Sequence, residues 1–207
     1  MSNHLEAIGQ IAHLMAEAED TESLSWMLKE TDEVGMKAAI LLALAIKDEP
    51  LAAFELIKYD GRKEDPDVLM VYARALGMSA QKHPHLARGV SDRLLTLLRH
   101  GEPSVRHGAI VGLTTLLKNE WGDDLSAIFG LLVAARTDKH PLNRAAAAEG
   151  LMDWGVPHLQ SMNRASRHAL DAVVLSILKS MLEDCAKHGE AEVQMACEQA
   201  LSALSGD

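Results

Sequence analysis

The sequence predicts an all-α fold, specifically an α-solenoid (α-α superhelix) of about five stacked antiparallel helix pairs, and three observations predict it. Aromatic residues make up only 3% of the 207 residues, and alanine and leucine supply much of the apolar content, which favours helices packed on helices over a β-sandwich. Apolar residues recur three and four positions apart, as in 86–98 and 170–182, and no segment alternates convincingly with period two. The helical pattern also repeats along the chain.

The first element is a helix over 4–19, which we expect to cap the amino-terminal end of one domain spanning 1–207 (cap within 1–20, helix pairs over 21–204). Five later segments align on an anchor residue that is followed eight positions on by leucine. The anchors are Val34, Val68, Val105, Asn143 and Val193, and the leucines are Leu42, Leu76, Leu113, Leu151 and Leu201. Positions 0, 4 and 8 of a helix share one face, so each segment is expected to bury the same stripe.

Partner helices are expected between these segments, at about 51–59, 84–99, 123–136 and 166–187. The breaks are short and carry proline or glycine, and a proline fits the first turn of a helix because no backbone donor is lost there. The anchors lie 34, 37, 38 and 50 residues apart. A helix pair of this length cannot bury a core alone and must stack on its neighbours.

The second helices resemble those of the HEAT-repeat family. The segment Glu102-Pro103-Ser104-Val105-Arg106, followed by Ala109 and Leu113, is similar to the family's second-helix signature, and so is His140-Pro141-Leu142-Asn143-Arg144 with Ala147 and Leu151. The resemblance covers most of residues 30–204 and implies a stack whose second helices line a concave, protein-binding face. The long fifth spacing and an expected irregular piece at 156–163 depart from an even array.

Arginine follows the anchor only at Arg106 and Arg144. These two residues are either an anion-binding ladder or, in the interpretation we favour, a structural ladder that bonds adjacent loops and ties the repeats together. In the same helix as Arg106, Gly108 and Gly112 stand four residues apart. Each costs its helix about 1 kcal/mol relative to alanine, which predicts a close helix contact that needs their small size.

The face opposite the leucine stripe carries the candidate partner-binding residues. Positions 2, 6 and 9 after the anchors hold Met36, Ile40, Met70, Arg74, His107, Val111, Glu149, Met152 and Met195. Flexible methionines are typical of surfaces that accept apolar partner helices. Two interpretations stay open at this point: these residues line an apolar groove, or neighbouring helices cover them as ordinary core.

No catalytic residue, metal or cofactor is expected. The chain has no His-Glu dipeptide, glycine-rich phosphate loop, nucleophile elbow or H-E-x-x-H motif. Cys185 and His188 could hold zinc only with help from Cys197, and small core thiols explain the two cysteines more simply. Two cysteines cannot form a disulfide framework, and the sequence shows no signal-peptide pattern or membrane-length apolar run, so we expect a soluble, cytoplasmic protein.

Charge argues against general nucleic-acid binding, because the chain carries a formal net charge of −10. Residues 66–122 form a central basic island with a net charge of +3, and the alternative function is a nucleic-acid-binding protein of DNA-glycosylase-like architecture that uses this island. The function we predict is a non-enzymatic scaffold or adaptor that binds an amphipathic helix or extended segment of another protein on the concave face.

Oligomeric state stays open between monomer and homodimer. The segment 34–46 is hydrophobic almost all round, with Lys37 as its only charge, so another part of the chain or a second copy must cover it.

Overall fold

The computed structural model describes residues 2–118 and 125–161, together with single or paired positions between 179 and 202. Within these residues it contains nine α-helices, one short 3-10 helix and no strand, which confirms the all-α class. The chain divides into two compact units, Met1–Trp121 and Gly122–Asp207, which are described separately below.

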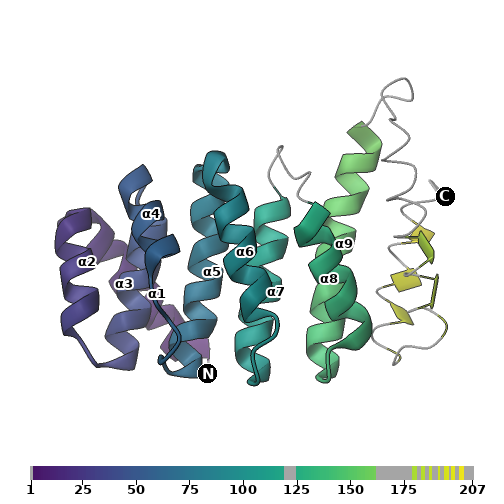
Figure 1. Cartoon of the computed structure of the whole chain (residues 1–207), viewed down its shortest axis with the longest axis horizontal. Helices are drawn as coiled ribbons and strands as arrows, with labels where there is room; N and C mark the ends of the chain where they lie inside the picture. The colour runs from purple at the N-terminus through teal and green to yellow at the C-terminus, as the bar shows by residue number, and fades with distance from the viewer. Residues whose placement is uncertain are drawn as a thin grey trace. The chain divides into compact units, whose positions relative to one another are not determined.

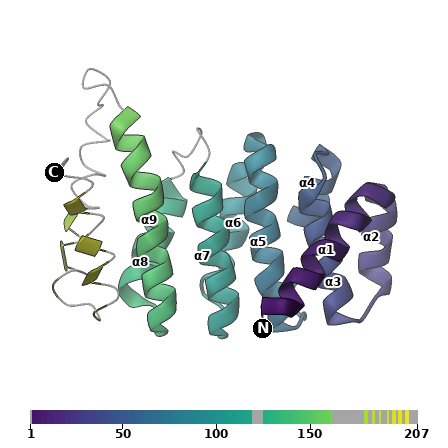
Figure 2. The same cartoon turned by 180° about the vertical axis from the view of Figure 1, so that it is seen from behind.

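The first unit consists of two layers of helices and an amino-terminal helix. Its elements are α1 (Ser2–Ala18), α2 (Thr21–Glu30), α3 (Val34–Ile46), α4 (Pro50–Lys58), α5 (Pro66–Lys82), the 3-10 helix η1 (Pro84–Leu86), α6 (Ala87–Leu97) and α7 (Pro103–Leu117). Helices α3, α5 and α7 lie side by side, α2, α4 and α6 pack behind them, and α1 packs on α3 (Figures 1 and 2). The helices predicted at 4–19, 51–59 and 84–99 are thus present, the last one beginning with η1.

Local sequence explains where these helices begin. Pro50, Pro66 and Pro103 each occupy the first turn of a helix, where their missing N–H costs no hydrogen bond. The Asp20 carboxylate caps α2 by accepting a hydrogen bond from the backbone N–H of Ser23 at 2.7 Å, and Asp65 caps α5 in the same way.

The predicted leucine stripe is buried in α5 and α7. Val68, Tyr72 and Leu76 are buried in α5, and so are Val105, Ala109 and Leu113 in α7. The stripe is less complete in α3, where Val34 at the helix start is 39% exposed and Leu42 is only partly buried. The side chains that define the stripe therefore form the core between the two layers.

Three glycines bring α5 and α7 into unusually close contact. A Cβ atom on Gly108 would lie 2.5 Å from the Met70 carbonyl oxygen, and one on Gly112 would lie 2.5 Å from the Ala73 carbonyl oxygen. Gly77 faces Gly112 with similarly little space. These contacts confirm that the helix contact needs small residues at the two predicted glycines. They also show that a residue of α5 lies beside the residue of α7 that follows it by about one anchor spacing, which is 37 residues here.

Cationic side chains join successive elements by bonding carbonyl groups at helix ends. Lys47 Nζ donates to the carbonyl oxygens of Ala16 (3.2 Å) and Glu19 (3.0 Å), which anchors the end of α1. Lys82 donates to the Ile46 carbonyl and Arg93 to the Ile57 carbonyl, each 36 residues earlier in the chain. The positive charges also suit the negative ends of the helix dipoles.

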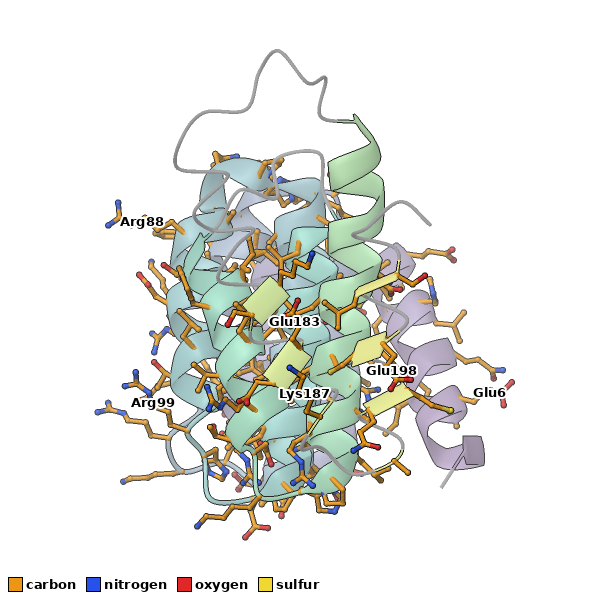
Figure 3. All side chains as sticks on the ribbon, turned by 90° about the vertical axis from the view of Figure 1, so that its right-hand side faces the viewer. Glu6, Arg88, Arg99, Glu183, Lys187 and Glu198 are labelled. Carbon is orange, nitrogen blue, oxygen red and sulfur yellow. The ribbon has the colours of Figure 1, made fainter. Side chains whose placement is uncertain are left out.

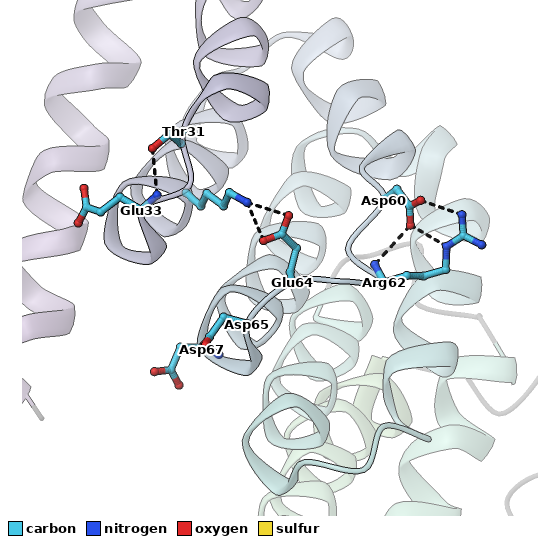
Figure 4. Close-up of polar contacts among 8 residues, drawn as sticks. Thr31, Glu33, Asp60, Arg62, Glu64, Asp65 and Asp67 are labelled. Atoms are coloured by element: carbon cyan, nitrogen blue, oxygen red, sulfur yellow. Dashed lines mark hydrogen bonds and ion pairs between the residues drawn. The ribbon is translucent and has the colours of Figure 1, made fainter.

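The loop between α4 and α5 is held by two ion pairs (Figure 4). Lys37 of α3 bonds both carboxylate oxygens of Glu64, at 3.0 and 2.9 Å, and both side chains are mostly buried. Arg62 bonds Asp60 at the exposed tip of the loop. The single charge of α3 is thereby neutralised within the chain.

The second unit contains α8 (Leu125–Thr137) and α9 (Pro141–Ser161), which pack against each other across a three-residue connection. Asn143, Ala147 and Leu151 of α9 are buried, as the repeat predicted. The irregular piece predicted at 156–163 was wrong over 156–161, because α9 continues through Pro157 to Ser161, and the last two residues of the predicted piece lie outside the described residues. The predicted helix at 166–187 and the anchor Val193 lie mostly outside the described residues.

Candidate partner-binding face

Five half-buried side chains form a continuous strip on α5 and α7. Met70, Arg74 and Met78 follow one another at four-residue intervals on α5, and His107 and Val111 do so on α7. The glycine contacts place Met70 beside Gly108 and Ala73 beside Gly112, so the two rows run next to each other. We call these five residues the α5–α7 face. In each helix, these residues lie on the side away from the buried stripe that begins at Val68 in α5 and at Val105 in α7, as the 3.6-residue period of a helix predicts.

Arg74 is the arginine of this face, and its side chain lacks hydrogen-bond partners within the described part of the chain. Its Nε atom is buried without a hydrogen-bond partner, and its guanidinium makes no hydrogen bond or ion pair with the described residues. A guanidinium offers five donors in a planar fork, and leaving buried donors unpaired costs free energy. The strip therefore combines two methionines and a valine with a cation that is available to a carboxylate.

On α3, at the amino-terminal end of the predicted face, one of the two predicted partner-binding residues is not exposed. Ile40 is fully buried, so it cannot contact a partner, and this assignment is corrected. The physical reason is that α3 is packed on several sides, by α1, α2, α4 and α5. Met36 is half-buried near the start of α3. The chain thus covers its most hydrophobic helix itself.

Helix α1 supplies part of that cover. Ile8 of α1 packs with Ala38 and Ala39 of α3 and with Val71 of α5, and Met15, Leu42 and Met70 pack around this cluster. Met70 therefore lies where α1 meets α5, at one end of the α5–α7 face. The sequence predicted the α1 helix as a cap but not which residues it would cover.

The remaining predicted residues belong to the second unit. Glu149 is exposed on α9, and Met195 is 61% exposed. The Met152 side chain lies outside the described residues. Glu149 does follow the same helical register as Arg74 and Val111, six positions after its anchor.

Arg106 and Arg144 make equivalent contacts in the two units. Nη1 of Arg106 donates to the carbonyl oxygen of His100 at 3.0 Å, and Nη1 of Arg144 donates to that of Asp138 at 2.8 Å. Each acceptor lies six residues before its arginine, in the turn that leads into the helix. These bonds reach backbone carbonyls of the turn, which agrees with a structural role in holding the adjacent loop.

The basic residues of the central island are distributed over both layers. Arg88 of α6 and Arg99 in the turn after α6 project into solvent (Figure 3), whereas Arg74 lies on α5 and Arg106 is buried in α7. Binding a nucleic-acid backbone requires several cations on one surface. Arg88, Arg93 and Arg99 are exposed on α6 or in the turn after it, so the cations of the island do not all share one surface but three of them lie near one helix.

The described part of the chain contains no cluster of three or more histidine, cysteine or acidic side chains that could hold a metal ion. Cys197 is buried, and Cys185 and His188 lie outside the described residues. In the same part of the chain, each helix is too short or too polar to cross a membrane.

Met78 is the residue of this face that sequence reasoning missed. It lies four residues after Arg74, so the helical period alone could have identified it. The unpaired state of Arg74 had no equivalent signal, because pairing depends on which side chains of other helices come near.

Comparison with known proteins gives the fold and no family. No protein-family model matches the sequence, and no curated protein matches it. Among solved structures, an engineered protein of the Northeast Structural Genomics Consortium is similar over 97% of this chain and 90% of its own, with a TM-score of 0.61 and 18% identity. A second engineered protein from the same consortium has a TM-score of 0.48 and 17% identity, covering 91% of this chain and all of its own. These likenesses concern the fold alone.

Proposed function

We propose that this protein is a HEAT-like α-solenoid that works as a non-enzymatic interaction module, with the α5–α7 face as its binding surface. The observation that carries the proposal is the unpaired guanidinium of Arg74 among half-buried methionines and a valine. The side-by-side register of α5 and α7 supports the repeat arrangement, because it agrees with the 37-residue spacing of their anchors.

The partner's chemistry follows from this surface. Arg74 favours a carboxylate, which can accept two parallel hydrogen bonds from the guanidinium fork. Met70, Met78 and Val111 favour apolar side chains beside that carboxylate, and methionine adapts to different shapes. An acidic amphipathic helix, or an acidic extended segment with apolar side chains, presents both features.

The test is capture of partners from a native extract by tagged protein, with and without nuclease, followed by affinity measurement with the partner segment. We compare Arg74→Gln with Arg88→Gln, a matched change at an exposed arginine of α6 (Figure 3). The proposal expects a protein partner that survives nuclease and is retained by Arg88→Gln. We expect Arg74→Gln to weaken binding of the isolated segment by at least about tenfold.

Two results would contradict the proposal. One is recovery of nucleic acid, or of proteins that disappear with nuclease, which would favour the basic-island alternative. The other is equal binding by Arg74→Gln and wild-type protein. Circular dichroism melting of both variants checks that each change leaves the fold intact.

A further inference from the structure

A second surface, on the other layer of the first unit, leaves large apolar side chains in solvent. Trp26 of α2 is 64% exposed, and Leu51 and Phe54 of α4 are 48% and 45% exposed. Lys58 places its Nζ 4.2 Å from the centre of the Phe54 ring. We call this surface the α2–α4 face. Neighbouring exposed apolar side chains of this size are typical of interaction sites, and aromatic residues dominate the energetics of such sites.

The α2–α4 face contains a shallow depression of about 290 Å³ between its two helices. Trp26 and Leu51 line it, together with Ser25, Lys29 and Glu55. Ser25 Oγ is buried and has no hydrogen-bond partner among the described residues. Because this oxygen has almost no surface accessible to solvent, an occupant of the depression meets chiefly the side chains of Trp26, Leu51, Lys29 and Glu55.

The charged side chains of the α2–α4 face are of both signs and follow one another in a defined order along the two helices. Glu22 and Lys29 lie seven residues apart on α2, one at each end of the surface, with Trp26 between them. On α4, Glu55 and Lys58 add one charge of each sign. These four charges cancel, and Glu30 at the end of α2 adds one negative charge, so the two helices together carry −1 whereas the whole chain carries −10. Two copies of this chain repel each other less here than on its acidic surfaces.

We propose that the α2–α4 face binds the same face of a second copy in an antiparallel, two-fold symmetric dimer. In a two-fold interface, the contact between residue i and residue j occurs twice. With α2 antiparallel to its symmetry mate, Glu22 of each copy meets Lys29 of the other, and the axis passes midway between them, near Ser25 and Trp26. Each indole then lies at the depression of the other copy.

The indole also fits the apolar part of the depression, which Leu51 and Trp26 line. Tryptophan presents a large apolar ring with one N–H, which is a donor only. In the opposite copy the ring covers the exposed apolar surface of Leu51. A strongly acidic or basic partner segment would instead meet a like charge at either Lys29 or Glu22. This surface is distinct from the α5–α7 face, so the dimer does not depend on the proposed function.

The test uses charge reversal and analytical ultracentrifugation of the full chain. Glu22→Lys sets two lysines opposite each other at both symmetry-related contacts, and Lys29→Glu sets two glutamates opposite each other there. Each variant alone should raise the dimer dissociation constant by at least about tenfold relative to wild type. Mixing the two variants in equal amounts should restore a dimer. In a dimer with one copy of each variant, contacts between opposite charges replace the like-charge contacts that each variant makes with itself.

The pairing in the mixture follows from the symmetry of the interface. In the mixed dimer, one contact joins the introduced lysine of the first variant to the introduced glutamate of the second. The other contact joins the native Lys29 of the first variant to the native Glu22 of the second. Both contacts therefore join opposite charges, which neither variant achieves with its own copy.

The restored heterodimer separates this geometry from misfolding. The raised dissociation constants of the single variants separate it from a parallel arrangement, in which wild-type copies would already place Glu22 opposite Glu22 and Lys29 opposite Lys29. Arg99→Glu, at an exposed position in the turn after α6, is the matched control and should leave the wild-type dissociation constant unchanged (Figure 3). The proposal is overturned if wild-type protein remains monomeric up to about 1 mM. It is also overturned if the reversals leave dimerisation unchanged, or if the mixed variants fail to associate.

Discussion

At the scale of single residues, the two tyrosines of the chain report on the core between α4 and α5. The rings of Tyr59 and Tyr72 meet edge to face with centroids 5.2 Å apart, and Tyr72 Oη donates to the Leu56 carbonyl oxygen at 2.9 Å. Burial raises the pKa of Tyr72 to about 12. Burial also raises the pKa of Tyr59 above its ordinary value, and the neighbouring Glu64 carboxylate raises it further.

These raised pKa values predict alkaline destabilisation with a definite sign. Above pH 10.0 the unfolded chain loses phenol protons that the folded chain keeps, so the free energy of unfolding should fall as pH rises to about 12. Below pH 10.0 this contribution to stability is fully present. The measurement is thermal melting across this pH range together with phenolate absorbance, which reads only Tyr59 and Tyr72 because the chain has two tyrosines.

The expected result is that phenolate appears together with loss of helical circular dichroism. In Tyr72→Phe, one of the two titrating groups should be absent from the absorbance change. If both phenols ionised at their ordinary pKa of about 10 while the helices stayed intact, the folded protein would not be burying the two phenol groups, and the prediction would be wrong.

At the scale of elements, the packing of α5 on α7 depends on glycine where most helices use larger residues. Gly77 and Gly112 face each other, and Gly108 faces the backbone of Met70. Glycine costs each helix up to about 1 kcal/mol relative to alanine, so the close approach must offset that cost. It does so by allowing two backbones to meet across a long shared surface.

We predict that Gly112→Ala destabilises the protein by about 1–3 kcal/mol, in spite of alanine's better helix propensity. The new Cβ would lie 2.5 Å from the Ala73 carbonyl oxygen, so the helices must separate. Urea denaturation followed by circular dichroism measures the change in the free energy of unfolding.

Gly9→Ala is the matched control, because a Cβ at position 9 of α1 meets nothing within 4 Å. Here only helix propensity changes, and the variant should gain up to about 1 kcal/mol. Equal stabilisation by Gly112→Ala and Gly9→Ala would contradict the close packing of α5 on α7.

At the scale of the whole molecule, each compact unit has buried side chains of its own. Leu44, Leu76 and Leu113 are fully buried in the first unit, and Ile128 and Leu131 are fully buried in the second. When helices contact mainly their sequence neighbours, stability becomes a sum of local contributions. The two units should therefore respond separately to a local core change.

Leu76→Ala tests this expectation. Removing the buried side chain should destabilise the first unit by about 2–5 kcal/mol through lost burial and a residual cavity. We expect hydrogen exchange, measured by mass spectrometry, to speed up in peptides from α3 to α7 while those of α8 and α9 change little. A uniform increase across all these helices would show that the chain unfolds as one cooperative unit.

Local sequence patterns were enough to predict most of the described helices, several of their starts and most of the buried stripe, although they did not single out α2. Pro66 and Pro103 begin helices, and Val68 and Leu76 are buried at the predicted positions, because helix initiation and the 3.6-residue period are local properties of the chain. Even the tight contact at Gly108 and Gly112 was predictable, since two costly glycines on one helix face need a reason.

Which helix faces remain exposed depends on how the helices pack together. The periodicity of α3 cannot show that other helices surround it and bury Ile40, and that of α5 cannot show that Arg74 finds no partner. Trp26 likewise gave no sequence signal that it would stand exposed beside Leu51. The physical reason is that exposure and pairing depend on which side chains of distant segments meet, whereas a helical pattern records only how one segment faces its own core.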